Sequence, residues 1–180
     1  MSQFSNPASA GGADAASYTA SLLELLNDRD PLESMREMPE KLAAAVNDVP
    51  PNLLGEPEAP GKWSIRQVVQ HLADSELVGS FRFRMVLAED RPALAAYDQD
   101  AWSERLHYSE SSVDDALAEF TSLRRANLRL FERASEGDRA RVGVHSERGE
   151  ESLAHMMKLY AAHDLVHLRQ IERIRAAVSR

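Results

Sequence analysis

Hydrophobic residues recur along this chain at steps of three and four, the spacing that gathers them on one face of a helix. The pattern becomes helical at Tyr18, breaks at "NDRDP" and resumes with Asp30 as a predicted N-cap and Pro31 at the first helical position. This second run extends to Val46. Pro39 inside it should either kink the helix or divide it in two.

Three more long helices follow, each preceded by a serine that suits an N-cap. Ser64 opens the first of them, Ser112 with Asp115 resembles a capping box that opens the second, and Ser152 opens the last. Gly137 is predicted to end the helix that starts after Ser112.

The connections between these helices are long and rich in turn residues. The segment "VPPNLLGEPEAPGKW" reads as a loop, residues 98–104 as a short helix, and "RVGVHSERGEES" as a small hairpin. Four major helical segments without clear strand alternation predict an all-α fold, a four-helix bundle. We expect residues 1–15 to form a disordered tail and residues 16–180 to form one helical domain.

Composition narrows the function classes. The formal net charge is −8 and no basic stripe interrupts it, which argues against nucleic-acid binding. Arg124, Arg125 and Arg129 are interpreted as a solvated helix face. The chain has no cysteine, so disulfides and thiolate ligands are excluded and any thiol chemistry needs an external thiol. With neither a signal peptide nor a membrane-spanning run, we expect a cytoplasmic protein.

Two histidines stand four residues apart on the apolar stripe of the last helix, His163 and His167. That spacing lets two imidazoles converge on one metal ion. His71 lies on the apolar stripe of another helix and would complete a three-nitrogen site, which zinc tolerates together with water and which nickel or iron also suits. Periodicity alone leaves two interpretations open: a metal site, or histidines that are satisfied within the core.

Five segments follow in order the motifs of the DinB/YfiT-like superfamily, which the chain therefore resembles: "GKWSIRQVVQHLADSE", "RFRMVLAED", "YDQDAW", "VHSERGEESL" and "YAAHDLVHLRQI". The resemblance implies an up-down-down-up bundle and a divalent metal, often nickel or zinc, on His71, His163 and His167. It also implies a homodimer. Members with known activity are thiol-dependent transferases or isomerases that use bacillithiol, mycothiol or glutathione, and others are labelled metal-dependent hydrolases.

The chain departs from the family pattern around the metal-binding positions. Gln70 and Glu76 stand where that group often has histidine, and Ala162 and Asp164 replace the tryptophan and glycine that often flank the histidine of the last helix. The expected ligands survive, but the surroundings that would set substrate choice differ. No specific reaction can therefore be carried over from the family.

Several neighbours of the histidines are candidates for further roles. Asp74, one turn after His71, could orient a ligand histidine or be a surface carboxylate, and His145 could shuttle protons or be a partly exposed loop residue; these two are the candidate catalytic residues. Glu76 is interpreted as a surface residue, and Asp164 as a partner of Arg169 or of another helix. Arg82 should pair with a carboxylate, Glu89 for example. Tyr97 braces a connection or lines the pocket.

The leading functional hypothesis is a metal-dependent enzyme that transfers or isomerises a substrate by way of a small-molecule thiol. Two alternatives stay open. The first is a hydrolase that uses a metal-activated water. The second is a bundle that binds a metal or another ligand without turnover.

Overall fold

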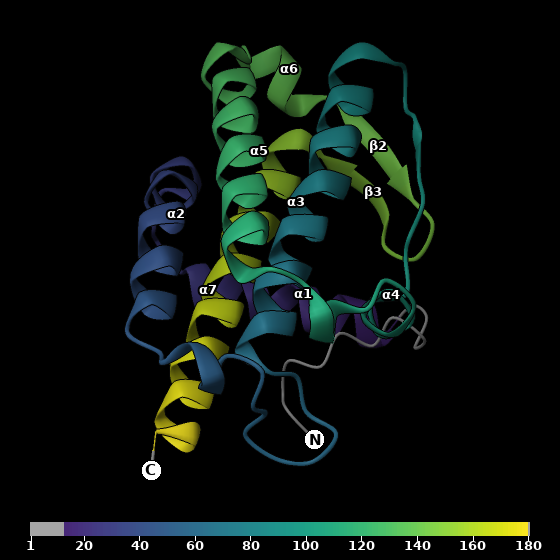
Figure 1. Ribbon diagram of the computed structural model, residues 1–180. Coiled ribbons are helices and arrows are strands. Elements are labelled where there is room, and N and C mark those ends of the chain that lie inside the picture. The colour runs from purple at the N-terminus through teal and green to yellow at the C-terminus, as the bar shows by residue number, and fades with distance from the viewer. Residues whose placement is uncertain (1–12, 180) are drawn as a thin grey trace.

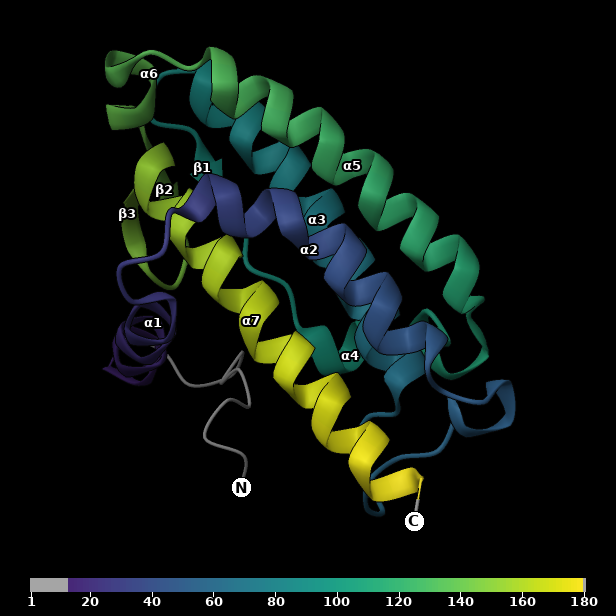
Figure 2. The ribbon, with the colours of Figure 1, turned by 90° about the vertical axis from the view of Figure 1, so that its left-hand side faces the viewer.

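Four long helices form a bundle in the computed structural model, which describes residues 13–179 (Figures 1 and 2). They are α2 (Pro31–Asn47), α3 (Ile65–Ala88), α5 (Val113–Arg133) and α7 (Leu153–Val178). α2 and α7 run in one direction, whereas α3 and α5 run in the other. The up-down-down-up bundle is thereby confirmed. Most of the predicted tail, residues 1–15, lies outside the described residues.

The predicted N-caps start the helices as expected. The side chains of Asp30, Ser64, Ser112 and Ser152 each accept a hydrogen bond from a backbone N–H in the first turn of the helix that follows. Gln67 completes a capping box with Ser64 and fixes where α3 begins. Pro39 lies inside α2 without ending it.

The crossover from α3 to α5 carries β1 (Ala93–Leu94), α4 (Gln99–Arg105) and the 3₁₀ helix η2 (Tyr108–Glu110). After α5 come α6 (Glu136–Ala140) and the predicted hairpin, β2 (Val142–His145) and β3 (Gly149–Ser152). β1 pairs with β2 in parallel, which local patterning did not indicate. The prediction that Gly137 ends α5 is wrong. α5 ends at Arg133, and Gly137 lies inside α6, which Ser135 caps by accepting a hydrogen bond from the backbone N–H of Asp138.

Two smaller elements complete the described chain. α1 (Ala13–Leu26) packs against α7 outside the bundle and is seen end-on in Figure 2. The 3₁₀ helix η1 (Pro51–Leu53) lies in the loop between α2 and α3. The hairpin packs closely on α3, where a Cβ on Gly143 would meet Val86 at 2.9 Å and Leu94 at 2.7 Å.

The hydrophobic core consists of two clusters at opposite ends of the bundle. One contains Met35, Phe83 and Phe131, and the other contains Leu42, Leu72 and Phe120. Between them every bundle helix except α2 contributes buried polar side chains: Glu76, Ser80, Arg124, Asn127, Asp164 and the histidines His71 and His167. Burying polar groups is costly unless they are bonded, so this layer is where chemistry or specific structure is expected.

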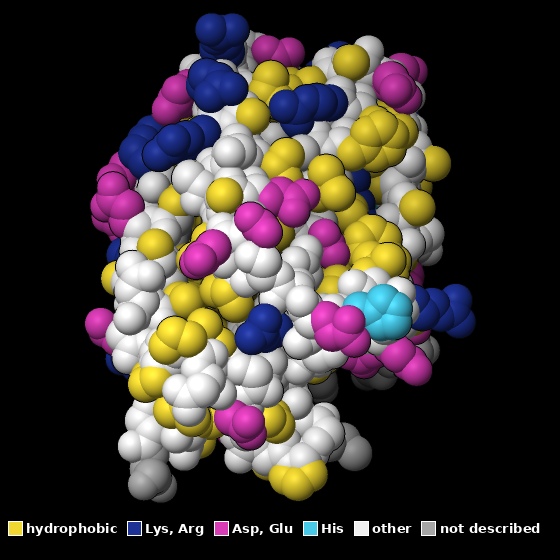
Figure 3. All heavy atoms as spheres, viewed as in Figure 1, with side chains coloured by type: hydrophobic (Ala, Val, Ile, Leu, Met, Phe, Trp, Pro, Cys, Tyr) yellow, Lys and Arg dark blue, Asp and Glu magenta, His cyan; other side chains and the backbone are white. Residues whose placement is uncertain are grey.

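The surface carries charge of both signs. In Figure 3 most visible Lys and Arg side chains lie toward the end where α5 meets α6, with Asp and Glu between them and across the middle of the face. Within residues 13–179 no helix is long and apolar enough to cross a membrane.

Candidate metal centre

Three histidine side chains from two helices meet in the polar layer. Nε2 of His163 on α7 lies 3.1 Å from Nε2 of His71 on α3 and 3.1 Å from Nε2 of His167 on α7. One ligand nitrogen from each residue lies within 4.8 Å of the other two. The structure thus brings together all three of the residues that the sequence singled out.

Local structure explains why these rings converge. The i, i+4 spacing on α7 stacks His163 and His167 on one face, with their ring centroids 4.4 Å apart. The capping box at Ser64 sets the register of α3, and the ring of Trp63 lies 5.1 Å from that of His71. The indole therefore covers one side of the cluster.

All three imidazoles are held in the neutral form. Burial lowers the pKa of His71 and of His163 well below the usual value, and it lowers the pKa of His167 to about 4 although Gln170 opposes the shift. The exposed fractions of His71 and His167 are 1% and 7%. A proton on any of these rings would be a buried charge, whereas a neutral ring offers a lone pair to a ligand.

Gln170 fixes which nitrogen of His167 carries the proton. Its Oε1 lies 2.8 Å from Nδ1 of His167 and is an acceptor, so Nδ1 donates the hydrogen bond. Nε2 of His167 is then the lone-pair nitrogen, and it points at the other two histidines. A hydrogen bond of this kind, on the far side of a ring, is typical of metal-binding histidines. Sequence analysis did not find Gln170, although its position three residues after His167 could have indicated it.

The donor set fits a divalent cation better than it fits internal hydrogen bonding. Bonds of about 2.0–2.1 Å at angles of about 90–109° would place two nitrogens about 2.8–3.4 Å apart, a range that includes 3.1 Å. One proton shared between two nitrogens can satisfy only one pair, so three converging nitrogens leave at least one contact without a proton. A cation would satisfy all three.

A cavity of about 340 Å³ reaches this cluster from outside. Its wall includes His167, Gln170 and Trp63, together with charged and amide side chains of Lys62, Gln99 and Arg169. The volume falls within the range of small-molecule sites. A small substrate could therefore reach His167, the one histidine of the cluster that lines this cavity.

The two candidate catalytic residues lie in other surroundings. The Asp74 carboxylate accepts a hydrogen bond of 2.5 Å from the Tyr108 hydroxyl and one of 3.4 Å from Gln70; a hydrogen bond to a histidine is not among its contacts with the described residues. His145 lies on β2 and is 2% exposed, so it is neither a loop residue nor partly exposed. Catalytic roles for both remain predictions.

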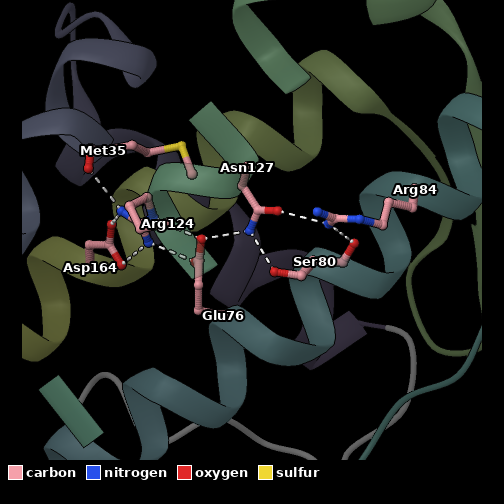
Figure 4. Close-up of polar contacts among 7 residues, drawn as sticks. All are labelled: Met35, Glu76, Ser80, Arg84, Arg124, Asn127 and Asp164. Atoms are coloured by element: carbon pink, nitrogen blue, oxygen red, sulfur yellow. Dashed lines mark hydrogen bonds and ion pairs between the residues drawn. The ribbon is translucent and has the colours of Figure 1, made fainter. Parts of the chain in front are cut away.

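A second group of polar contacts, drawn in Figure 4, includes Asp164, the residue that follows His163 on α7. The Arg124 guanidinium, 0% exposed, donates to Glu76 at 2.8 and 2.9 Å, to Asp164 at 2.6 and 3.1 Å, and to the carbonyl of Met35 at 3.2 Å. Asn127 donates to Glu76 and to Ser80, and it accepts from Arg84. We call these seven residues the Arg124 network; it connects all four bundle helices.

The Arg124 network corrects two predictions. Glu76, expected at the surface, is 1% exposed, and Arg124, expected on a solvated face, is completely buried. Burial lowers the pKa of Arg124, but the charges of Asp164 and Glu76 outweigh this effect and raise it, so the guanidinium stays charged. Asp164 on α7 pairs with Arg124 on α5, which agrees with the predicted alternative that it contacts another helix.

Arg82 also differs from expectation. Its guanidinium is buried, 6% exposed, and donates to the carbonyl of Ala95, whereas the predicted pairing with Glu89 is not formed. Tyr97 packs its ring on Trp102, with ring centroids 4.5 Å apart, which agrees with the predicted bracing of this connection.

Comparison with known proteins adds an independent observation. The sequence profile of the DinB superfamily matches residues 34–171. A Bacillus mycoides protein named "Putative metal-dependent hydrolase" is 30% identical over 158 residues, which cover 88% of this chain and 90% of that protein. A Bacillus cereus protein of the same name is 31% identical over 144 residues, 80% of this chain and 83% of that protein.

A solved structure is also similar. YfiT from Bacillus subtilis, described as "a probable metal-dependent hydrolase with an unusual four-helix bundle topology", superposes with a TM-score of 0.76 and 30% identity. The match covers 80% of this chain and 83% of YfiT. Sequence and fold thus point to the same group of proteins.

Proposed function

This chain belongs to the DinB superfamily, and we propose that it is a hydrolase whose reaction depends on a divalent cation bound by His71, His163 and His167. The observation that carries the proposal is the convergence of three neutral imidazole nitrogens beside a cavity. The names of the relatives support hydrolysis in preference to thiol transfer.

A cation in this site would act as a Lewis acid that lowers the pKa of a coordinated water toward neutrality. Two neighbouring residues support such a site. Gln170 keeps the Nε2 lone pair of His167 available, and Trp63 shields His71 from solvent. Three protein ligands without an evident fourth among the described residues leave positions for water and substrate, as in catalytic rather than structural zinc sites.

The expectation of a thiol cosubstrate rests on family resemblance alone. The same holds for zinc or nickel as the native metal and for a homodimer. These remain predictions, and the experiment below tests the thiol dependence.

The test is hydrolysis of 4-nitrophenyl acetate by protein loaded with zinc or nickel, with and without glutathione. We expect 4-nitrophenol release without thiol, and a loss of at least about 100-fold in His163→Ala. His107→Asn is the matched control, because His107 is exposed and its left-handed backbone (φ 54°) suits asparagine. Release that needs glutathione and yields S-acetylglutathione would replace the hydrolase by a thiol transferase.

A further inference from the structure

Arg82 is a buried cation without a buried anion. Among residues 13–179 its guanidinium lies within ion-pair distance of no carboxylate; it donates to the backbone carbonyl of Ala95 and lies within hydrogen-bonding reach of the Tyr160 hydroxyl. The other strongly buried arginine, Arg124, binds two carboxylates. Taking a charge out of water without a partner costs several kcal/mol, so an unpaired buried guanidinium indicates a site for an anion that is not part of the fold.

The polar side chains around Arg82 are hydrogen-bond donors. Arg82 donates to Ala95, which follows Leu94, the β-sheet partner of His145, and precedes Tyr97 by two residues. The Tyr160 ring lies against Gly79, three residues before Arg82 on α3. Burial raises the pKa of both tyrosines, so their hydroxyls keep their protons. In His145, Nδ1 accepts from the backbone N–H of Glu147, so the proton of the neutral ring is on Nε2.

His145 Nε2 is a buried donor without a hydrogen-bond partner among the described residues. Burial lowers the pKa of His145 to about 4, and the ring is therefore neutral at pH 7. Gly143, two residues earlier on β2, packs on Val86 of α3, and alternation along the strand places His145 on the same inner face. An unsatisfied buried donor destabilises the fold, and a bound acceptor would remove that cost.

The nearby carboxylates do not serve this role, because each is already bonded elsewhere. Asp74 accepts from Tyr108, Glu76 accepts from Arg124, and Glu151 accepts from Arg148 at 2.5 and 2.9 Å. Arg82, Tyr97, Tyr160 and His145 thus offer four donors, of which Arg82 is the cation, and none of them is paired with a carboxylate.

This group of donors adjoins the three histidines. Tyr160 stands three residues before His163 on α7, and its ring lies so close to Gly79 that a Cβ there would meet it at 2.5 Å. Arg82 is about 16 Å from His71 along α3, but a helical side chain leans toward the amino end of its helix, here toward His71.

We propose that Arg82, Tyr97, Tyr160 and His145 bind an anionic group, a carboxylate or a phosphate, of the substrate whose scissile bond lies at the three histidines. The identification of the anion as part of a substrate rests on the proposed hydrolase. Anion binding by the four donors can be tested without any measurement of activity. The carboxylate and phosphate forms share one chemistry, and the probes below distinguish them.

The experiment is isothermal titration calorimetry of the full chain with succinate and with inorganic phosphate. We expect wild type to bind at least one of the two anions with a dissociation constant of about 1 mM or lower, and Arg82→Gln to bind it at least about tenfold more weakly. Arg125→Gln, which removes an exposed arginine from α5, should bind like wild type. Arg82→Lys keeps the charge and should retain more affinity than Arg82→Gln, which guards against loss of binding through misfolding.

A second arm separates anion binding from the metal site. His163→Ala should still bind the anion, because its four donors are intact; binding lost in His163→Ala but kept in Arg82→Gln would place the anion on the cation and overturn the inference. Failure of both anions to bind wild type would overturn it as well. Neither result depends on whether the protein hydrolyses any ester, so the proposed function is judged separately.

Discussion

The Arg124 network and the histidine cluster occupy the same polar layer of the bundle and solve the problem of burial in opposite ways. Around Arg124, donors and acceptors match: one guanidinium meets two carboxylates and a carbonyl, and Asn127 bonds to its neighbours. In the histidine cluster, three ring nitrogens converge, and a proton on one of them can satisfy only one of the two contacts of 3.1 Å.

That difference separates structure from function. The Arg124 network needs no further ligand, and it holds α3 and α7 in the relative position that brings His71 to His163. The histidine cluster leaves ring nitrogens without a protein partner, and the divalent cation that we propose would satisfy all three. A closed polar group beside an open one is therefore the pattern of a support and the site that it supports.

The largest expected effect is on the closed side. Arg124→Met leaves the carboxylates of Glu76 and Asp164 buried without their cation, and we expect it to lower the free energy of unfolding by about 3–5 kcal/mol. Urea denaturation followed by circular dichroism measures this change. Arg125→Met, one residue away and exposed, should change stability by less than about 0.5 kcal/mol.

A triple variant sharpens this test. Removing both acidic charges together with the guanidinium, in Arg124→Met with Glu76→Gln and Asp164→Asn, should recover part of the lost stability, because no unpaired charge remains. Equal stability of Arg124→Met and wild type would show that the network does not stabilise the bundle.

The next effect concerns pH and a buried histidine outside both groups. His145 has a pKa of about 4 in the folded protein, where burial lowers it, against about 6.5 in an unfolded chain. The unfolded state therefore binds more protons between these values, so the stability that is present above pH 6.5 falls as pH drops toward 4. Between pH 7 and pH 4.5, the free energy of unfolding should fall by about 2 kcal/mol less in His145→Gln than in wild type.

The measurement is urea denaturation of chelator-treated protein at the two pH values. His107→Asn serves as the control, because its exposed side chain should leave the pH dependence of wild type unchanged. Identical pH dependence in wild type and His145→Gln would mean that this ring is not buried in neutral form.

A smaller effect is expected behind His167. Gln170→Leu removes the acceptor that keeps the proton of His167 on Nδ1, and it should weaken binding of a divalent cation about 10- to 100-fold. Competition against a chromophoric chelator gives the affinity. Gln99→Leu changes another amide in the wall of the same cavity and should leave the affinity intact. If both variants bind alike, the hydrogen bond of Gln170 does not orient the ligand.

Features that depend on neighbouring residues were predictable from the sequence. The caps at Ser64 and Ser152 follow from short-range hydrogen bonding, and the turn-rich segment before Ser152 forms the hairpin. The pairing of β1 with β2 joins residues 93–94 to residues 144–145 and leaves no local pattern. The end of α5 was misplaced because the cap at Ser135 starts a new helix before Gly137.

For the site, the histidines could be predicted because spacing and an apolar stripe place them together. Sequence patterns predict Glu76 at the surface because it lies off the helix face of His71, and Arg124 on a solvated face because acidic residues flank the arginines. Arg124 lies four residues after Phe120 and four before Leu128, on the buried stripe of α5. A charged residue at such a position indicates a buried partner on another helix, but the sequence does not say which one.

The most direct test of the central claim is the metal content of protein purified without chelator and measured by inductively coupled plasma mass spectrometry. If the three histidines bind a metal, we expect about one divalent cation per wild-type chain and about one per chain in His107→Asn. His163→Ala should hold less than about a tenth of that amount. Equal metal content in wild type and His163→Ala would contradict it.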